Sequence, residues 1–261
     1  MGLIDSHAHL TDENLIGAID EVLGRARAGG VERIITVAQS VADAERAIEL
    51  ARGRDEVSAT AGIHPHEAGA VRDDDWRKLE ALLAEPEVVA CGEIGLDYHY
   101  EFADRSLQQA VLVRQLALAG DADLPLIIHC REAFDDTIRL LTESSYSGRP
   151  VVFHCFGGRA EDAERLGEQG WRLSFTGSVT YKSARGAQDV ARAYPADRLM
   201  IETDSPYLSP TPLRGRFPNE PAHLMHTARF LADLRNEPLE ELIAQTAANT
   251  RDFFGLRSEG G

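Results

Sequence analysis

The sequence has few cysteines, and their number and spacing exclude two classes of protein. Its 261 residues contain three, Cys91, Cys130 and Cys155, with no Cys-x-x-Cys pair. An odd and low count argues against a disulfide framework, and the missing pair argues against a thiolate zinc knuckle. We therefore expect the three cysteines to be small buried residues at strand ends.

Basic residues are also scarce. There are 27 lysines and arginines against 43 aspartates and glutamates, which gives a formal net charge of −16 at pH 7. Such a chain lacks the basic surface that holds a long duplex by neutralising its phosphates. An anionic substrate would therefore be attracted locally, by metal ions or by a few arginines.

Long apolar runs are absent. No run approaches the ~18 residues of a membrane span. The N-terminus has no basic segment followed by an apolar stretch and a cleavage site. We therefore expect a cytoplasmic protein that does not associate with membranes, and no obligate protein partner is evident.

What the sequence does contain is a short apolar run, rich in β-branched residues, that recurs eight times with helix-length charged segments between. The runs span residues 2–5, 33–38, 57–62, 88–93, 125–130, 150–155, 171–177 and 198–203. Strands that alternate with helices imply parallel β-α units, and eight of them in a chain of this length predict a TIM barrel, (β/α)8. We expect one such domain over residues 1–261. A doubly wound open sheet is the alternative, weakened because no Gly-x-Gly-x-x-Gly follows the first run.

Histidines and carboxylates stand at the ends of five of these runs, where barrels of this kind carry their reacting groups. They are His7, His9, Glu93, His129, His154 and Asp204. The first two are two residues apart, so on a strand both side chains project to the same face. Packing four imidazoles and two carboxylates together would incur a large desolvation cost, which divalent cations relieve. The pattern predicts a metal centre at the C-terminal ends of the strands.

Over essentially the whole chain, an ordered set of motifs resembles the TatD-type metal-dependent hydrolases and deoxyribonucleases, within the wider amidohydrolase-like barrels. The motifs are DSHAHL (5–10), GIHPH (62–66), GEIGLDY (92–98), PLIIHCR (125–131), HCFGG (154–158), FTGSVTYK (175–182), ETDSPYLSP (202–210) and RGRFPNEP (214–221). Each motif alone is weak, but the ordered set is highly specific.

By this resemblance, the two histidines of the first motif hold one metal ion together with Asp204. His129 and His154 complete the site of a second ion, and Glu93 bridges the two. The resemblance therefore implies two divalent cations per subunit, with Mg²⁺, Mn²⁺ and Zn²⁺ all open.

Two such ions about 3.5–4 Å apart can clamp a phosphodiester and activate a water between them. Asp204 is placed to take the proton of the nucleophile, and Glu93 is the other carboxylate of the catalytic centre. This predicts hydrolysis without a covalent enzyme intermediate. A serine nucleophile is a poor alternative because the chain has no Gly-x-Ser-x-Gly motif, and the Walker A pattern is also absent.

Two further carboxylates follow from strand parity. Glu202 stands two residues before Asp204, and Asp5 stands two before His7. Both side chains are expected to point inward, below the metals. Each could accept the second N–H of a ligand histidine and fix its tautomer. For Glu202 the alternative is a role in packing the barrel layer.

Three residues are expected to bind substrate. His64, at the end of the third run, looks by the resemblance like a substrate-side group rather than a metal ligand. Arg131, beside His129, and Arg214, in a loop with glycine and proline, are candidate phosphate-binding cations. The alternative for either arginine is a surface salt bridge. In the same loop, Asn219 is expected to be the N-cap of the helix that follows.

Together these features predict a divalent-metal-dependent hydrolase, most simply a deoxyribonuclease that trims the ends of nucleic acids. The alternative is a hydrolase of the same fold acting on a small phosphoester, an ester or an amide. A binding protein with a vestigial site is a poor third, because no ligand position is lost. The negative charge favours small or single-stranded substrates over long duplex.

Overall fold

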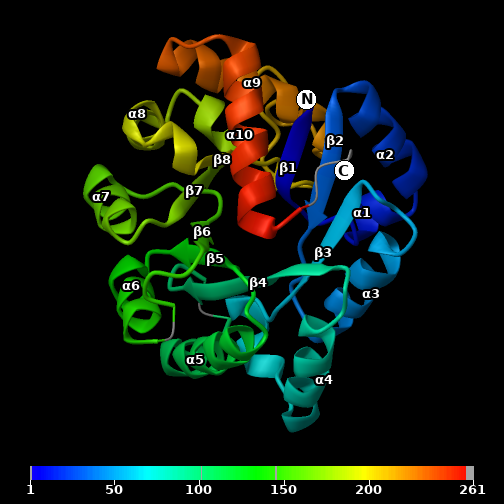
Figure 1. Ribbon diagram of the computed structural model, residues 1–261, viewed down its shortest axis with the longest axis vertical. Helices are drawn as coiled ribbons and strands as arrows, with labels where there is room; N and C mark the ends of the chain where they lie inside the picture. The colour runs from blue at the N-terminus through cyan, green and yellow to red at the C-terminus, as the bar shows by residue number, and fades with distance from the viewer. Residues whose placement is uncertain (1, 101, 145, 257–261) are drawn as a thin grey trace.

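The computed structural model describes residues 2–100, 102–144 and 146–256. Within them, eight parallel strands form one sheet whose spatial order is the chain order. The strands are β1 (Leu3–Ala8), β2 (Val31–Thr36), β3 (Val57–Ala61), β4 (Val88–Asp97), β5 (Leu126–Arg131), β6 (Val151–Phe153), β7 (Arg172–Phe175) and β8 (Leu199–Ile201). All eight predicted strands are confirmed, and they curl into a nearly closed ring (Figure 1).

The ring is completed by the segment that follows β8. The backbone N–H of Asp204 donates to the carbonyl of His7 with an N–O distance of 2.9 Å, and the N–H of His9 donates to the carbonyl of Ser205 at 2.7 Å. A parallel bridge joins Ala8 to Ser205. The same backbone hydrogen bonds that close the barrel therefore bring Asp204 beside the two histidines of β1.

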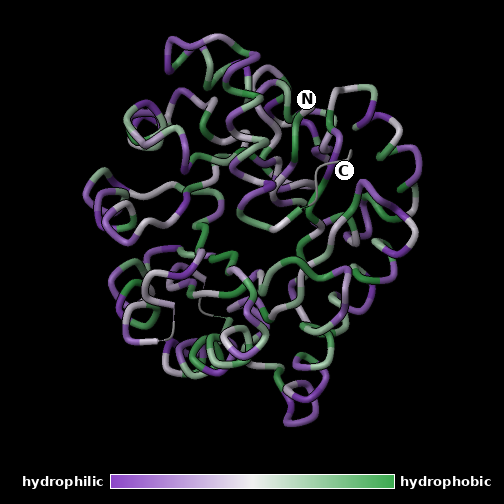
Figure 2. Tube along the Cα trace, in the orientation of Figure 1, coloured by the Kyte–Doolittle hydropathy of each residue, from purple (hydrophilic) through white to green (hydrophobic). Residues whose placement is uncertain are grey.

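Helices fill the connections between strands and form an outer layer (Figure 1). The α-helices are α1 (Glu13–Ile16), α2 (Ile19–Ala28), α3 (Val41–Ala51), α4 (Asp73–Leu83), α5 (Arg105–Asp121), α6 (Phe134–Glu143), α7 (Ala160–Glu168), α8 (Arg185–Ala193), α9 (Leu224–Arg235) and α10 (Leu239–Phe254). Short 3₁₀ turns are η1 (Pro65–Ala70), η2 (Gly177–Thr180), η3 (Ala196–Arg198) and η4 (Pro221–His223). The strands are mostly hydrophobic and the outer turns mostly hydrophilic (Figure 2).

An apolar layer fills the inside of the barrel below the predicted site. Ile127, Val152 and Met200 belong to one buried cluster, together with Phe253 and Phe254 from the end of α10. The three strand residues stand two positions before His129, His154 and Glu202, so each shares the inward face of its strand with a polar residue above it. The polar groups of the site therefore lie directly above an apolar layer, the barrel floor, to which the end of α10 contributes.

Strand β4 is longer than the sequence predicts. It was expected to end at Glu93 but continues to Asp97. Its register against β5 shifts between Cys91 and Ile94, which is a β-bulge. A bulge inserts an unpaired residue and re-aims the side chains next to it. Glu93 is therefore a mid-strand residue directed inward at an irregularity, rather than a strand end.

The predictions for cysteines and membrane spans have separate outcomes. Cys91 is buried, whereas Cys130 and Cys155 are half-buried, so the prediction that all three cysteines are buried is confirmed for Cys91 alone. All three are free thiols. No helix in the described part of the chain is both long and apolar enough to cross a membrane.

Candidate metal centre

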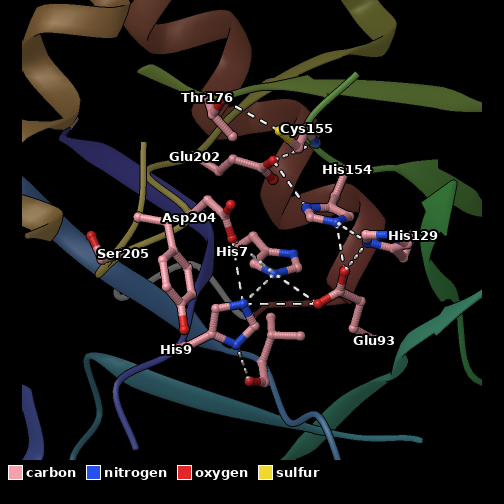
Figure 3. A network of polar contacts seen from close by, with 12 residues as sticks. His7, His9, Glu93, His129, His154, Cys155, Thr176, Glu202, Asp204 and Ser205 are labelled. Atoms are coloured by element: carbon pink, nitrogen blue, oxygen red, sulfur yellow. Dashed lines mark hydrogen bonds and ion pairs between the residues drawn. The ribbon is translucent and has the colours of Figure 1, made fainter. Parts of the chain in front are cut away.

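The structure brings the six predicted ligands together at the mouth of the barrel, where they converge on one point (Figure 3). They come from or directly follow five different strands: His7 and His9 from β1, Glu93 from β4, His129 from β5, His154 from β6 and Asp204 from the segment after β8. Residues on one strand of a closed barrel meet those of distant strands only at its axis. The closure of the barrel therefore determines the cluster.

Glu93 lies at the centre of the cluster, and its two oxygens face different groups of histidines. Oε2 lies 3.5 Å from Nε2 of His7 and 3.8 Å from Nε2 of His9. Oε1 lies 2.6 Å from Nε2 of His154 and 2.8 Å from Nδ1 of His129. This carboxylate connects two separate sets of nitrogen ligands.

The first set is His7, His9 and Asp204. Nδ1 of His9 lies 2.9 Å from the carbonyl oxygen of Val37, which can only accept, so Nδ1 carries the hydrogen. In the neutral ring, Nε2 then presents a lone pair, and it faces Nε2 of His7 at 3.3 Å and Oδ1 of Asp204 at 3.4 Å. Nδ1 of His7 is buried without a hydrogen-bond partner among the described residues. Converging lone pairs of this kind fit a divalent cation.

The second set is His129 and His154 with Glu93. Nε2 of His129 lies 3.1 Å from Oδ2 of Asp97, so it donates its hydrogen to that carboxylate. Its Nδ1 then faces Glu93 and lies 3.4 Å from Nε2 of His154. Nitrogen and oxygen donors again converge with one tautomer fixed from outside, as metal-binding histidines require.

The charge states agree with this interpretation. Burial alone would raise the pKa of Glu93, but the imidazoles of His154, His64 and His129 hold that pKa well below its usual range. Burial alone would lower the pKa of His9, but Asp204 and Glu93 raise it to about 9. Without an ion, protons on the imidazoles must balance the buried carboxylates, and divalent cations would take over that balance.

Asp97 belongs to the site although the sequence analysis did not single it out. Its Oδ2 accepts from His129 and from Nε2 of His66 at 2.9 Å, and its Oδ1 accepts the backbone N–H groups of His99 and Tyr100. These donors hold the pKa of the buried carboxyl well below its usual range. The alternation of side chains along a strand could have revealed Asp97, because residues 93, 95 and 97 face the same way if β4 continues past Glu93.

The two carboxylates expected below the metals behave differently. Glu202 accepts the backbone N–H of Cys155 at 2.6 Å, and its Oε1 lies 3.5 Å from Nδ1 of His154. That nitrogen makes no hydrogen bond among the described residues, so Glu202 stands behind His154 as expected but does not accept its N–H. Asp5 instead accepts from the backbone N–H and hydroxyl of Thr203, at 2.9 and 2.6 Å. Among the contacts of the described residues, no ligand imidazole donates to Asp5. Its carboxyl group anchors the chain after β8 and does not hold a histidine.

Of the three residues expected to bind substrate, the structure places two at the pocket and one outside its lining. His64 is buried with Nε2 3.5 Å from Oε1 of Glu93, and burial lowers its pKa to about 4. Arg131 lines the pocket above the cluster, with its guanidinium 4.7 Å from the ring centre of Tyr100. Arg214 does not line that pocket but lies over Tyr181, at 4.2 Å. Two of the three therefore border the metal cluster.

The pocket itself has a volume of about 860 Å³ and opens at the C-terminal ends of the strands. His9, Glu93, His129, His154 and Asp204 lie on its wall. A buried cluster of imidazoles and carboxylates at the open mouth of a (β/α)8 barrel defines the class of metal-dependent hydrolases.

Comparison with known proteins identifies the family. Residues 4–255 match the profile of the TatD related DNase family, and the chain belongs to that family. It is a metal-dependent hydrolase, as the sequence predicted, and it depends on divalent metal.

Several relatives match nearly the whole chain. The uncharacterized metal-dependent hydrolase YabD of Bacillus subtilis is 38% identical, and the alignment covers 97% of this chain and 99% of YabD. The 3'-5' ssDNA/RNA exonuclease TatD of Erwinia amylovora is 35% identical, and the alignment covers 97% of this chain and 100% of that relative. The crystal structure of YJJV, a TatD homologue of Escherichia coli, superposes with a TM-score of 0.92, 31% identity and 98% coverage of each chain.

Proposed function

We propose that this chain hydrolyses phosphodiester bonds at the ends of nucleic acids, using two divalent cations bridged by Glu93. The observation that carries the proposal is the placement of that carboxylate, whose oxygens face two separate sets of nitrogen ligands. His7, His9 and Asp204 would hold one ion, and His129 and His154 the other. A relative of 35% identity is named a 3'-5' ssDNA/RNA exonuclease, which supports this substrate class.

Two bound divalent ions would polarise the phosphate and lower the pKa of water toward neutrality. The residues of the chain supply the rest. Burial alone would raise the pKa of Asp204, but hydrogen bonding to His9 and the charges of His7 and His154 lower it. Its carboxylate is therefore ionised at neutral pH and can accept the proton of the attacking water.

His64 and Arg131 are proposed to hold the phosphate. Nδ1 of His64 accepts the backbone N–H of His66 at 3.2 Å, so in the neutral ring Nε2 carries the hydrogen and can donate to a phosphate oxygen. Arg131 is the one arginine or lysine that the described residues contribute to the lining of the pocket, so it adds a positive charge there to an acidic protein. Arg214 is not part of this proposal because it lies outside the pocket lining.

The test is a substrate panel with metal-stripped protein reloaded with Mg²⁺, Mn²⁺ or Zn²⁺. Single-stranded DNA, single-stranded RNA, duplex DNA and a set of small phosphoesters, esters and amides would be compared. We expect release of nucleotides from single-stranded ends. Turnover of esters or amides with no cleavage of any nucleic acid would refute the nuclease and favour the same-fold alternative.

A variant links the activity to the cluster. Glu93→Gln keeps the shape of the side chain but removes the charge shared by both ligand sets, so nuclease activity should fall at least about 100-fold. Glu80→Gln, on the exposed face of α4, is the matched control and should be fully active. Full activity of Glu93→Gln would show that the cleavage occurs elsewhere.

A further inference from the structure

In the described part of the chain, the exposed aromatic rings lie either in the lining of the metal pocket or beside a ring that lines it. Tyr100 and Tyr207 line the pocket, and Phe102 and Phe217 lie outside its lining, next to them. Four of the described phenylalanine, tyrosine and tryptophan residues are exposed: Tyr100 (43% exposed), Phe102 (67%), Tyr207 (43%) and Phe217 (59%). The first two follow β4, and the last two follow β8. In an eight-stranded ring in chain order, these strands stand opposite each other (Figure 1). The rings therefore form two pairs on opposite sides of the mouth.

The first pair is a stack at the edge of the pocket. The rings of Tyr100 and Phe102 have centres 5.7 Å apart and planes inclined by 26°. The His66 ring stands edge-on to both, at 5.6 and 4.8 Å. Arg131 lies over the Tyr100 ring, and Tyr100, His66 and Arg131 all line the pocket. Phe102 is thus held at the outer end of a fixed stack that starts beside the metal cluster.

The second pair, Tyr207 and Phe217, lies beside His9, which belongs to the first set of proposed ligands. The Tyr207 ring lies 6.1 Å from the ring of His9 and 6.5 Å from the ring of Phe217. The Tyr207 hydroxyl lies 3.4 Å from Oδ2 of Asp12, and Tyr207 lines the pocket. An aromatic ring is thus presented to solvent on this side of the cluster as well.

These rings contribute little to the packed core, since each leaves two fifths or more of its surface in water. Their position matters because cationic residues are rare at the pocket: Arg131 is the one arginine or lysine in its described lining. A chain of net charge −16 cannot hold a polyanion by phosphate neutralisation alone. Stacking of bases on aromatic rings supplies binding energy that does not depend on charge.

We infer that the two aromatic pairs stack unpaired bases on either side of the scissile phosphate, and that they make single-stranded nucleic acid the preferred substrate. The inference rests on the proposed nuclease function and adds residues that determine its specificity. A base in a duplex already stacks on its neighbours and pairs with its complement, so only an unpaired base can lie flat on Phe102 or Phe217. Duplex ends would have to fray before they could be cleaved.

The test compares kcat/KM for a single-stranded oligonucleotide with kcat/KM for the same strand lacking one base, on one side or the other of the scissile phosphate. Phe102→Leu and Phe217→Leu remove the aromatic face but keep apolar bulk, and both sites are exposed, so folding is preserved. Each variant should lower the ratio of intact to abasic cleavage about 10-fold, mainly through KM.

The two variants should respond to different abasic positions, because the pairs lie on opposite sides of the cluster. Phe102→Trp should keep the wild-type ratio of intact to abasic cleavage that Phe102→Leu loses, since tryptophan supplies an aromatic face of larger area. Val113→Ala, an exposed apolar residue on α5 outside the pocket lining, is the control and should leave the ratio unchanged.

A failure of the proposed nuclease function and a failure of the stacking inference would give different results. If the wild-type protein cleaves no nucleic acid with any of the three metals, the proposed function and this inference both fall. If the wild type cleaves the oligonucleotide but Phe102→Leu and Phe217→Leu keep the wild-type ratio, only the inference falls. Equal losses on intact and abasic strands, or a changed sedimentation coefficient with an unchanged ratio, would also overturn it, assigning the rings to structure or to a protein interface.

Discussion

At the scale of single residues, the proposed ligands are oriented by side chains that stand behind them, and Asp97 is the clearest case. Asp97 receives four hydrogen bonds, two from the imidazoles of His66 and His129 and two from backbone N–H groups. All four partners are donors, so the position requires an acceptor on both oxygens. Only an ionised carboxylate satisfies it, and this requirement fixes the tautomer of His129.

Asp97→Asn is therefore expected to weaken metal binding. One orientation of the amide places its NH₂ group against His66 and His129, which turns His129 away from the tautomer that Asp97 holds. The other places it against the backbone N–H groups of His99 and Tyr100, whose hydrogen bonds fix the position of the side chain. We predict a 10- to 100-fold loss of affinity for one of two Mn²⁺ ions, measured by titration calorimetry. Asp74→Asn, an exposed carboxylate paired with Arg77, is the control. Unchanged affinities for both ions would contradict the role of Asp97.

Asp5 gives a prediction about pH. Burial raises the pKa of its carboxyl to about 8. In the unfolded chain the pKa returns to its ordinary value near 3.8. As the pH rises from about 4 to about 8, the unfolded state loses this proton more readily than the folded state, so the folded state loses stability across that window.

Asp5→Asn mimics the protonated acid, because its amide can accept from the Thr203 N–H and donate to the Thr203 hydroxyl. Between pH 5 and pH 8, the metal-free wild type should lose roughly 2–4 kcal/mol more unfolding free energy than the variant. Urea denaturation of both proteins at the two pH values measures the difference. Parallel losses in the two proteins would show that Asp5 is ionised in the folded state.

At the scale of secondary-structure elements, the presence and order of the strands were predictable, whereas irregularities within them were not. The eight strands were visible because each is a short β-branched run between helical segments. The extension of β4 was not, since Gly92 and Gly95 interrupt its apolar pattern, and the position of Asp97 was lost with it. The predicted capping role of Asn219 is wrong, because Glu220 stands at the N-cap of η4 and His223 at that of α9. The amide of Asn219 donates instead to the carbonyls of Thr203 and Tyr207, which holds the loop after β8 together.

The role of α10 as part of the barrel floor is also testable. Phe253 is 4% exposed and packs with strand residues directly below the site. Phe253→Ala should lower the free energy of unfolding by about 3–5 kcal/mol through lost burial and the cavity left behind. Leu107→Ala, at an exposed position of α5, should cost well under 1 kcal/mol. A small loss for Phe253→Ala would mean that the floor closes without α10.

At the scale of the whole molecule, the architecture and the convergence of the six histidines and carboxylates could be predicted from the sequence, because both follow from strand order. Residues at the ends of strands far apart in the chain must meet once the ring closes. It could not reveal which loop residues border the pocket. Arg131 and Arg214 looked equivalent in sequence, but their separation depends on the path of the loop after β8. The two aromatic pairs near the pocket could not be predicted for the same reason, because their rings lie in loops.

Anomalous diffraction from crystals of the Mn²⁺-loaded protein would locate the proposed two-ion centre bridged by Glu93. We expect two anomalous peaks about 3.5–4 Å apart. One peak should lie beside His7, His9 and Asp204, the other beside His129 and His154, with the carboxylate of Glu93 contacting both. A single peak, or two peaks without Glu93 between them, would contradict it.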